Sequence, residues 1–303
     1  MKFISVVLTV FLAVSINKSF GQDELFPPVG SCGITNIEPK ESTRIVNGIA
    51  ATPHSFPWQC LLVGFFTNGT AKHYCGCSII SPRHILTAAH CVVDMKNDPD
   101  NVRIYPGLHY FSASTLIKDN GLPCREIFVH GSYAASSLNN DVAVLRLKTA
   151  VQIDYEKTAP ICYPLATNAD AVKVNEEVIA TGWGSMSGSP NRTSAHRPTE
   201  LMQVRLKHVP NSQTDCKKLT SILGFIDQPA KMCAYGEWKS VCFGDSGGPL
   251  IRKRTTNGGQ TYYEQVGIMS GTIDCSFTKP MPDIYANVRY LSKFITDSVK
   301  KSP

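Results

Sequence analysis

The chain has 303 residues, with 30 Lys and Arg against 24 Asp and Glu, so its formal net charge is +6. With 43% hydrophobic and only 18% charged residues it can bury a core, which excludes a predominantly disordered protein. Apart from the basic run at residues 252–254, the positive charge is scattered along the chain. A nucleic-acid-binding protein concentrates such charge on one element, so the sequence argues against nucleic acid as a partner.

The N-terminus has the pattern of a secretory signal peptide. Lys2 precedes an apolar run over residues 3–14, and small residues lie at the positions that a signal peptidase recognises. We expect cleavage after Gly21, which removes residues 1–21. The apolar run is too short to cross a hydrocarbon core of about 30 Å, so we expect no membrane partner and a secreted, extracellular protein.

Residues 22–44 are rich in Pro, Glu, Ser and Thr, and we expect them to form a pro-segment. From residue 45 onward, short strand-like runs alternate with clusters of Gly, Pro, Asn and Ser, which is typical of an all-β protein. We expect strands over residues 142–147, 177–181, 201–209 and 262–270. In the run at 201–209, Met202, Val204 and Leu206 share one face, and the polar residues 203, 205 and 207 share the other.

Only two stretches favour helices. Residues 212–223 begin with cap-type residues after a proline, and near the C-terminus Leu291, Phe294, Ile295 and Val299 form one apolar stripe. The residues from 45 to 303 therefore suit two packed β-barrels or sandwiches followed by a terminal helix.

Three residues combine into a candidate catalytic group. His90 lies in the motif at 87–91 (Thr-Ala-Ala-His-Cys), where an apolar strand meets small residues. Asp141 directly precedes an apolar strand, so its carboxylate needs a partner in the core, and a histidine is the obvious candidate. Ser246 lies in the glycine-rich motif at 244–249 (Gly-Asp-Ser-Gly-Gly-Pro), which lets a substrate approach the main chain.

The order of these residues separates the serine hydrolase classes. The motif around Ser246 also fits the G-x-S-x-G pattern of α/β-hydrolases, but these need a histidine after the serine, and all eight histidines precede it. The subtilisin-like order needs an aspartate before the histidine and finds only Asp23, in the pro-segment, ahead of His90. The order His, Asp, Ser remains.

The chain resembles a secreted serine protease zymogen of the trypsin/chymotrypsin (S1) family. The resemblance is carried, in the family's order, by residues 44–48 (Arg-Ile-Val-Asn-Gly), 87–91, Asp141 with its strand, 181–184 (Thr-Gly-Trp-Gly), 244–249 and 282–285 (Pro-Asp-Ile-Tyr). It implies a peptidase domain over 45–303 with a chymotrypsin-like fold. In this all-β fold two six-stranded antiparallel barrels, at about 45–160 and 161–288, precede a C-terminal α-helix at about 289–300.

The resemblance also implies a role for each motif. Ser246 would be the nucleophile, His90 the general base and acid, and Asp141 its orienting carboxylate, with the N–H groups of Gly244 and Ser246 as the oxyanion hole. Cleavage after Arg44 would free the amino group of Ile45 to pair with Asp245. No cofactor is implied, and no metal site is expected.

By the same resemblance, four cysteine pairs are expected. They are Cys75 with Cys91, Cys216 with Cys233, Cys242 with Cys275, and Cys32 with Cys162. Three further cysteines remain, at positions 60, 77 and 124. We expect a cross-strand bond between Cys60 and Cys77, while pairing of either one with Cys124 stays open.

The predicted substrate pocket gives conflicting signals. Trypsins have an aspartate six residues before the nucleophile, where this chain has Ser240, so the resemblance favours a chymotrypsin-like, elastase-like or mixed specificity. Thr272 would narrow the mouth of the pocket, whereas Asp283 would attract a basic side chain if it reached the base. The residues expected to form the pocket are Ser240, Phe243, Ser270, Gly271, Thr272 and Asp283.

The sequence thus predicts a secreted, proteolytically activated serine endopeptidase, with sequons for glycosylation at Asn68 and Asn191. We expect a monomer whose partners are protein or peptide substrates, an activating protease and protein protease inhibitors. No recognition module precedes residue 45, which favours a digestive or venom-type role. The alternative is a catalytically silent protease homologue that acts as a binding or regulatory protein.

Overall fold

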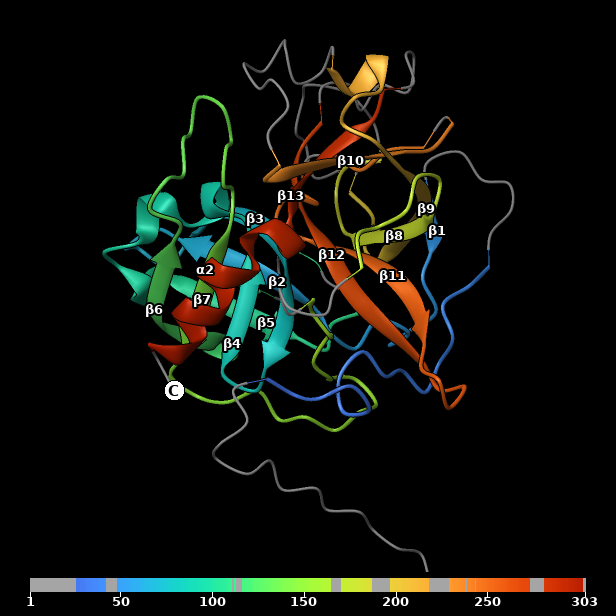
Figure 1. Ribbon diagram of the computed structural model, residues 1–303. Coiled ribbons are helices and arrows are strands. Elements are labelled where there is room, and N and C mark those ends of the chain that lie inside the picture. The colour runs from blue at the N-terminus through green and yellow to red at the C-terminus, as the bar shows by residue number, and fades with distance from the viewer. Residues whose placement is uncertain are drawn as a thin grey trace, which may run out of the picture.

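The computed structural model describes residues 26–41, 48–110, 112, 116–164, 170–186, 197–217, 229–237, 239–242, 244–272 and 281–301. Within these ranges the chain forms two closed six-stranded antiparallel β-barrels that lie side by side (Figure 1). A C-terminal helix follows the second barrel. The predicted all-β, chymotrypsin-like fold is therefore confirmed.

The first barrel closes in the order β2-β3-β4-β7-β6-β5. Every residue of β2 and β4 is buried, because these strands contact the barrel interior on one face and other parts of the protein on the opposite face. The strands are β2 (Gln59–Phe65), β3 (Ala71–Ser81), β4 (His84–Thr87), β5 (Val102–Pro106), β6 (Leu122–Val129) and β7 (Ala143–Leu147).

The second barrel closes in the order β8-β9-β10-β13-β12-β11, and the short strand β1 (Ile49–Ala50) joins the edge of β9. Its strands are β8 (Glu177–Gly182), β9 (Met202–Val209), β10 (Lys231–Tyr235), β11 (Pro249–Thr255), β12 (Thr261–Gly271) and β13 (Asp283–Asn287). In β9, Val204 and Leu206 are buried as the alternation predicts. Gln203, expected on the polar face, is also buried, because its side-chain amide donates to Lys40 O.

Polar side chains join the two barrels across a buried interface. Thr181 Oγ1 of β8 donates to Gln59 Oε1 of β2 at 2.7 Å. Ser78 Oγ of β3 donates to Gln265 Oε1 of β12 at 2.6 Å. Because buried polar groups are costly unless they are hydrogen-bonded, each of these bonds favours one relative placement of the barrels.

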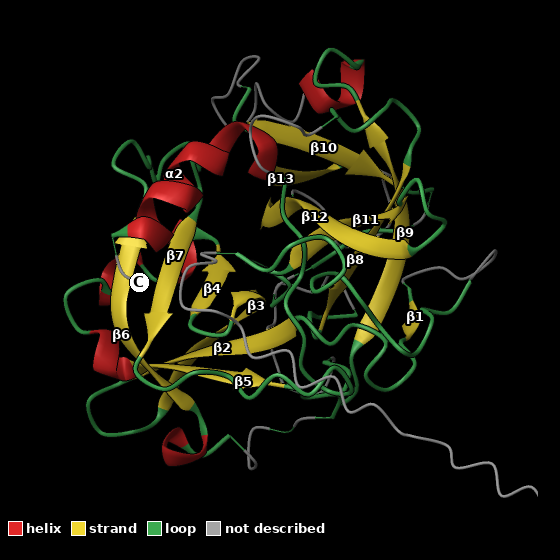
Figure 2. Ribbon diagram, turned by 60° about the horizontal axis from the view of Figure 1, so that its bottom comes forward, coloured by secondary structure: helices red, strands yellow, loops and turns green. Residues whose placement is uncertain are grey.

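The remaining regular elements are short except for α2 (Val288–Lys300), which agrees with the helix expected at 289–300. Asn287 caps this helix, since its side chain accepts a hydrogen bond from Tyr290 N. The helix leaves the second barrel and packs back onto the first, contacting β7 as well as β12 and β13 (Figure 2). The 3-10 turns are η1 (Ala89–Cys91), η2 (Val93–Met95), η3 (Pro99–Asn101) and η5 (Lys118–Asn120).

The described residues cover only part of the first of the two helices that the sequence predicts. Of the helix expected over 212–223, the described part is helical at residues 214–217, and residues 218–228 lie outside the described ranges. In the part of the chain that the structure describes, no helix is long and apolar enough to span a bilayer.

The described part of the predicted pro-segment, residues 26–41, is attached to the second barrel and to the segment that leads into it. A disulfide joins Cys32 to Cys162. Gly33 N donates to Pro160 O at 2.8 Å, and Tyr263 N donates to Gly33 O at 2.8 Å. Gly33 has a φ of +63°, and a Cβ there would lie 2.0 Å from Tyr263 O, so only glycine permits this close approach.

The described residues contain four disulfides, which link Cys32 to Cys162, Cys60 to Cys77, Cys75 to Cys91, and Cys216 to Cys233. Cys60 and Cys77 are directly opposite each other in the β2–β3 register, which brings their Cα atoms to 5.0 Å. Cys242 is also disulfide-bonded, and its expected partner Cys275 lies outside the described residues. Cys124 is a free, buried cysteine.

The placement of Cys124 predicts a single unreactive thiol. Cys124 lies on β6 with its side chain buried, and burial raises the pKa of the thiol to about 12, so little reactive thiolate forms near neutral pH. In the absence of reductant, we expect iodoacetamide to modify Cys124 only once the protein is denatured. We expect non-reducing peptide mapping to recover a Cys60–Cys77 pair. A mapped bond from Cys124 to either cysteine would contradict this arrangement.

Candidate active site

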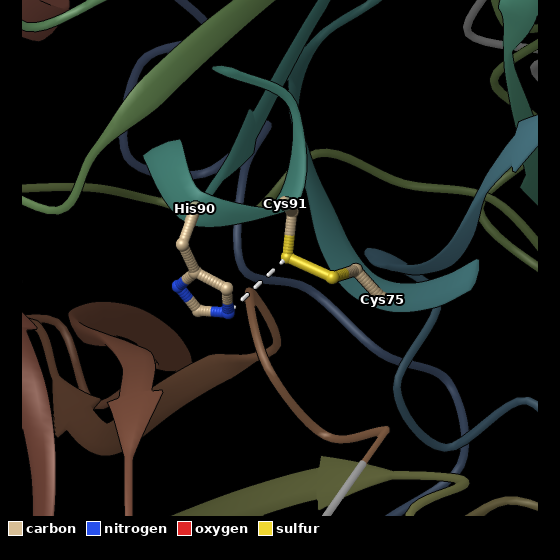
Figure 3. A group of neighbouring side chains, drawn as sticks. All are labelled: Cys75, His90 and Cys91. Atoms are coloured by element: carbon tan, nitrogen blue, oxygen red, sulfur yellow. Dashed lines mark hydrogen bonds between the residues drawn. A yellow bond between two sulfur atoms is a disulfide. The ribbon is translucent and has the colours of Figure 1, made fainter. Parts of the chain in front are cut away.

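His90 lies in the 3-10 turn η1, immediately after β4. Ala88 and Ala89 are fully buried, and their small side chains let the chain turn closely against the first barrel. The next residue, Cys91, is bonded to Cys75 on β3, which ties the turn to the sheet (Figure 3). The imidazole is thus presented from a rigid turn, with a quarter of its side chain exposed.

Asp141 is fully buried two residues before β7 and accepts three hydrogen bonds. Its Oδ1 accepts from His90 N at 2.9 Å, and its Oδ2 lies 2.7 Å from His90 Nδ1. Ser270 Oγ of β12 donates to the same Oδ2 at 2.6 Å. Because an ionised carboxylate only accepts, the imidazole carries its proton on Nδ1 and leaves Nε2 free to accept one.

Ser246 lies in a tight turn at the interface of the two barrels. Gly76 N of β3 donates to Ser246 O at 2.7 Å, which fixes the loop against the first barrel. Gly247 has a φ of +80°, and a Cβ there would lie 2.2 Å from Thr87 Oγ1 and 3.3 Å from Ala88 N. The glycine therefore places the loop of Ser246 directly beside the turn that carries His90.

The structure does not join His90 to Ser246 by a hydrogen bond. Instead His90 Nε2 faces Cys91 Sγ at 3.7 Å (Figure 3). Within the described part of the chain Ser246 Oγ makes no hydrogen bond. Catalytic hydrogen bonds often tighten only once substrate is bound, so a rotation of the imidazole toward Ser246 is the change that this arrangement needs.

Cys75, His90 and Cys91 have the composition of a metal-binding cluster, with ligand atoms within 4.8 Å of one another. Both sulfur atoms are engaged in the Cys75–Cys91 disulfide, so neither is a thiolate ligand. The cluster is therefore explained as a disulfide beside the imidazole.

The main chain beside Ser246 offers unused hydrogen-bond donors. Gly244 has a φ of +108°, a conformation that L side chains rarely adopt. Among the described residues, neither Gly244 N nor Ser246 N donates to a protein acceptor, whereas Asp245 N donates to Cys242 O and Gly247 N to Met269 O. Two free N–H groups next to a serine can stabilise negative charge on a substrate oxygen.

Asp245 is half-buried as a residue, and its desolvated carboxylate is held by the main chain of the second barrel. Its Oδ1 accepts from Gly184 N at 2.7 Å, and its Oδ2 accepts from Cys242 N at 2.8 Å. A Cβ at Gly182 or Gly184 would lie 2.0 or 2.2 Å from a carboxylate oxygen, so both glycines are needed to admit the side chain.

No ion pair neutralises Asp245 within the described residues. Burial raises the pKa of its carboxyl because the charged form is desolvated, while the two backbone donors and the charge of Arg197 act in the opposite direction. A small cavity adjoins the carboxylate, and its lining includes Gly48, Met202 and Ser240.

The predicted pocket residues meet beside this loop. Ser240 Oγ donates to Asp283 Oδ1 at 2.6 Å and lies 3.5 Å from Thr272 Oγ1. Ser270, expected in the pocket wall, instead bonds Asp141 through its hydroxyl. Gly271 follows it at the end of β12. Several predicted site residues lie outside the described ranges, namely Arg44, Ile45, Phe243, Asn191 and Cys275.

Sequence analysis missed two cations near the site. Lys231 of β10 is buried and donates to Ser137 O at 2.9 Å, and burial lowers its pKa to about 7, against an opposing effect of Asp141. Arg197 lies over the ring of Tyr74, with Cζ 5.4 Å from the ring centroid. A lone lysine in the apolar run of β10 was the available signal for the first, and no pattern marks the second.

Comparison with known proteins adds an independent observation. The trypsin family model matches residues 45–295, beginning at the residue that follows the predicted pro-segment. The chain is 30% identical to trypsin alpha-4 of Lucilia cuprina, over 89% of this chain and 93% of that protein. It is 31% identical to trypsin alpha of Drosophila melanogaster, over 86% and 89% respectively. With melanization protease 1 of Drosophila melanogaster the identity is 29%, over 91% of this chain and 70% of the relative.

The network around Asp141 predicts graded effects on catalysis. Asp141→Asn places an amide beside Nδ1 and favours the wrong imidazole tautomer, so kcat should fall about 10⁴-fold. Ser270→Ala removes one hydrogen bond to a charged group, worth about 1.5–3 kcal/mol, so kcat should fall about 10- to 100-fold. Both effects are measured as kcat on a peptide amide substrate, with the chain cleaved after Arg44. The control is Asp297→Asn, on the outer face of α2. Wild-type kcat in Ser270→Ala would refute the role given to this hydroxyl.

Proposed function

Since the chain belongs to the trypsin family of serine endopeptidases, we propose that it hydrolyses peptide bonds in proteins with Ser246, His90 and Asp141 as its catalytic triad. The observation that carries the proposal is the pair of bonds from Asp141 to His90, one to the main chain and one to Nδ1. They orient the imidazole and set its tautomer, which is the function of the acid in a Ser-His-Asp triad.

In the proposed first step, the imidazole rotates toward Ser246, whose Oγ attacks the substrate carbonyl while its proton passes to His90 Nε2. The N–H groups of Gly244 and Ser246 stabilise the oxyanion of the tetrahedral intermediate. The imidazolium gives its proton to the leaving amine as the C–N bond breaks, which leaves an acyl-enzyme. Water, deprotonated by neutral His90, then hydrolyses the ester and restores the Ser246 hydroxyl.

We further propose that the protein is a zymogen activated by cleavage after Arg44. The new amino group of Ile45 would enter the cavity beside Asp245 as the cation that this carboxylate lacks. Gly48, which lines the cavity, lies three residues from Ile45, and three residues span about 10 Å at most, so the new terminus is within reach. Removing one partner from a buried ion pair costs about 3–5 kcal/mol, enough to keep an uncleaved chain inactive.

The extracellular assignment rests on residues 1–21 as a signal peptide and on the disulfides, which persist in oxidising compartments. Asn68, a proposed glycosylation site, supports the extracellular assignment, because this side chain is exposed at the tip of the β2–β3 hairpin. Its Oδ1 accepts hydrogen bonds from Thr70 N at 3.0 Å and from Thr70 Oγ1 at 2.7 Å. Asn191 is proposed as a second site. We propose that the enzyme acts as a monomer, with protein substrates, an activating protease and protein inhibitors as partners.

For the biological role we propose protein degradation of a digestive or venom type. A second role is favoured by one specific observation, since the name of one relative links that protein to melanization. In that case the substrate would be a single protein rather than many. Digestion of a mixture of unrelated denatured proteins separates the two roles, because a degradative enzyme cleaves many of them.

The activation proposal predicts that Asp245→Asn abolishes activity while secretion stays intact. The amide oxygen still accepts one of the two backbone hydrogen bonds, but the NH2 group cannot accept the other, and the neutral side chain cannot pair with the Ile45 ammonium. The loop of Gly244 and Ser246 therefore stays inactive after cleavage. The measurement is fluorophosphonate labelling of Ser246 together with peptide hydrolysis, before and after cleavage at Arg44. The control is Asp297→Asn, whose half-exposed side chain pairs with Lys293 on α2.

Three outcomes are informative. Labelling of the cleaved wild type and loss of labelling in Asp245→Asn support catalysis and activation together. Full turnover by cleaved Asp245→Asn would overturn the activation mechanism alone. A cleaved wild type that never reacts at Ser246 would instead support the catalytically silent homologue.

A further inference from the structure

Three residues that the sequence assigns to the substrate pocket come from separate segments of the chain and meet one another. Ser240 belongs to the segment that leads to Ser246, and Asp283 begins β13. Thr272 follows the end of β12, two residues after the Ser270 that bonds Asp141. The β12–β13 register pairs Gly271 with Ile284, so the end of β12 lies beside the start of β13.

These side chains are connected to one another by hydrogen bonds. Ser240 Oγ donates to Asp283 Oδ1 at 2.6 Å, and the side chain of Thr272 also donates to Asp283. Thr272 Oγ1 is 3.5 Å from Ser240 Oγ. Val241 N donates to Asp283 Oδ2 at 3.2 Å. The two sides of the pocket are therefore bridged at this level.

The distance between the two hydroxyl oxygens excludes a side chain from the space between them. Atoms in van der Waals contact are about 3.5–4.0 Å apart, so a group lying between two walls needs the wall atoms to be about 7 Å apart. Ser240 Oγ and Thr272 Oγ1 are at half that distance. A substrate side chain must end before it reaches this bridge.

The Asp283 carboxyl is satisfied by its neighbours rather than held open for a cation. Its side chain is 1% exposed, and its described partners are neutral donors. Burial raises the pKa of Asp283 to about 7, with Asp245 adding to the effect and the hydrogen bonds opposing it. At neutral pH the group thus carries only part of a negative charge.

We propose that Thr272, Ser240 and Asp283 close the base of the substrate pocket, so that the enzyme cleaves after small, uncharged residues such as Ala and Val. The proposal rests on the proposed proteolytic function and specifies its substrate class. Phe or Arg before the cleaved bond would have to separate Thr272 from Ser240 and break the bonds to Asp283. A buried polar group left unpaired makes such discrimination large, on the order of 10- to 100-fold or more.

The test uses the cleaved enzyme and four peptide amides that differ only in the residue before the cleaved bond, namely Ala, Val, Phe or Arg. For the wild type we expect kcat/KM for Ala and Val to exceed the values for Phe and Arg by at least about 10-fold. Thr272→Gly removes the bridging side chain, and kcat/KM for Phe and for Arg should each rise at least about 10-fold.

A double variant separates space from charge. In Thr272→Gly with Asp283→Asn, the gain for Phe should remain, while the gain for Arg should disappear because the opened pocket no longer has a carboxyl at its base. Thr255→Gly, at the exposed end of β11, is the matched control and should keep the wild-type order of substrates. If Thr272→Gly does not fold, Thr272→Ala removes the same hydroxyl and the same comparison applies.

Fluorophosphonate labelling of Ser246 in each variant measures the fraction of working active sites independently of the pocket. A wild type that is labelled but cleaves after Arg or Phe as fast as after Ala would overturn the closed pocket and leave the proteolytic function standing. Labelled Thr272→Gly with the wild-type preference would also overturn it. Absence of labelling in the cleaved wild type would refute the proposed function, and the pocket proposal with it.

Discussion

The proposed site depends on the desolvated carboxylate of Asp245, which forms no ion pair within the described residues. Taking an ionised carboxylate out of water is costly unless it is paired, and among the described residues only backbone N–H groups donate hydrogen bonds to this one. Gly182 and Gly184 leave the space that the carboxylate occupies. The neighbouring residues, Gly244 and Ser246, supply the proposed oxyanion donors, so in the proposed activation a cation that reaches Asp245 would act on the conformation of this loop.

A second constraint is that neither barrel holds a complete site. His90 and Asp141 belong to the first barrel, whereas Ser246 and the hydroxyl of Ser270 come from the second. The hydrogen bond from Gly76 N to Ser246 O and the packing of α2 on β7 hold the halves in register. The network around Asp141 therefore forms only when both barrels are folded and docked.

Local patterns were sufficient to predict much of this protein. Short alternating runs indicated the strands, and the order of His90, Asp141 and Ser246 excluded two other hydrolase classes. What sequence could not supply was contact between distant segments. The bond from Ser270 to Asp141 spans 129 residues, and Ser270 was assigned to the pocket wall instead. The contact between Thr272, Ser240 and Asp283 likewise depends on how β12 and β13 lie beside the loop of Ser246. Only the three-dimensional structure shows whether Asp283 is available to a basic side chain.

The most direct test of the central interaction is the pH dependence of Ser246 labelling by a fluorophosphonate in the chain cleaved after Arg44. An ion pair with Asp245 raises the pKa of the Ile45 amino group above its usual value of about 7.7–8.0, so the stabilisation is present below that value and lost as pH rises through the raised pKa. We predict that labelling is rapid near neutral pH and falls at alkaline pH with that higher apparent pKa, while the uncleaved chain reacts slowly throughout. Equal labelling of cleaved and uncleaved chains, or labelling of the cleaved chain that persists until the protein unfolds, would contradict the account.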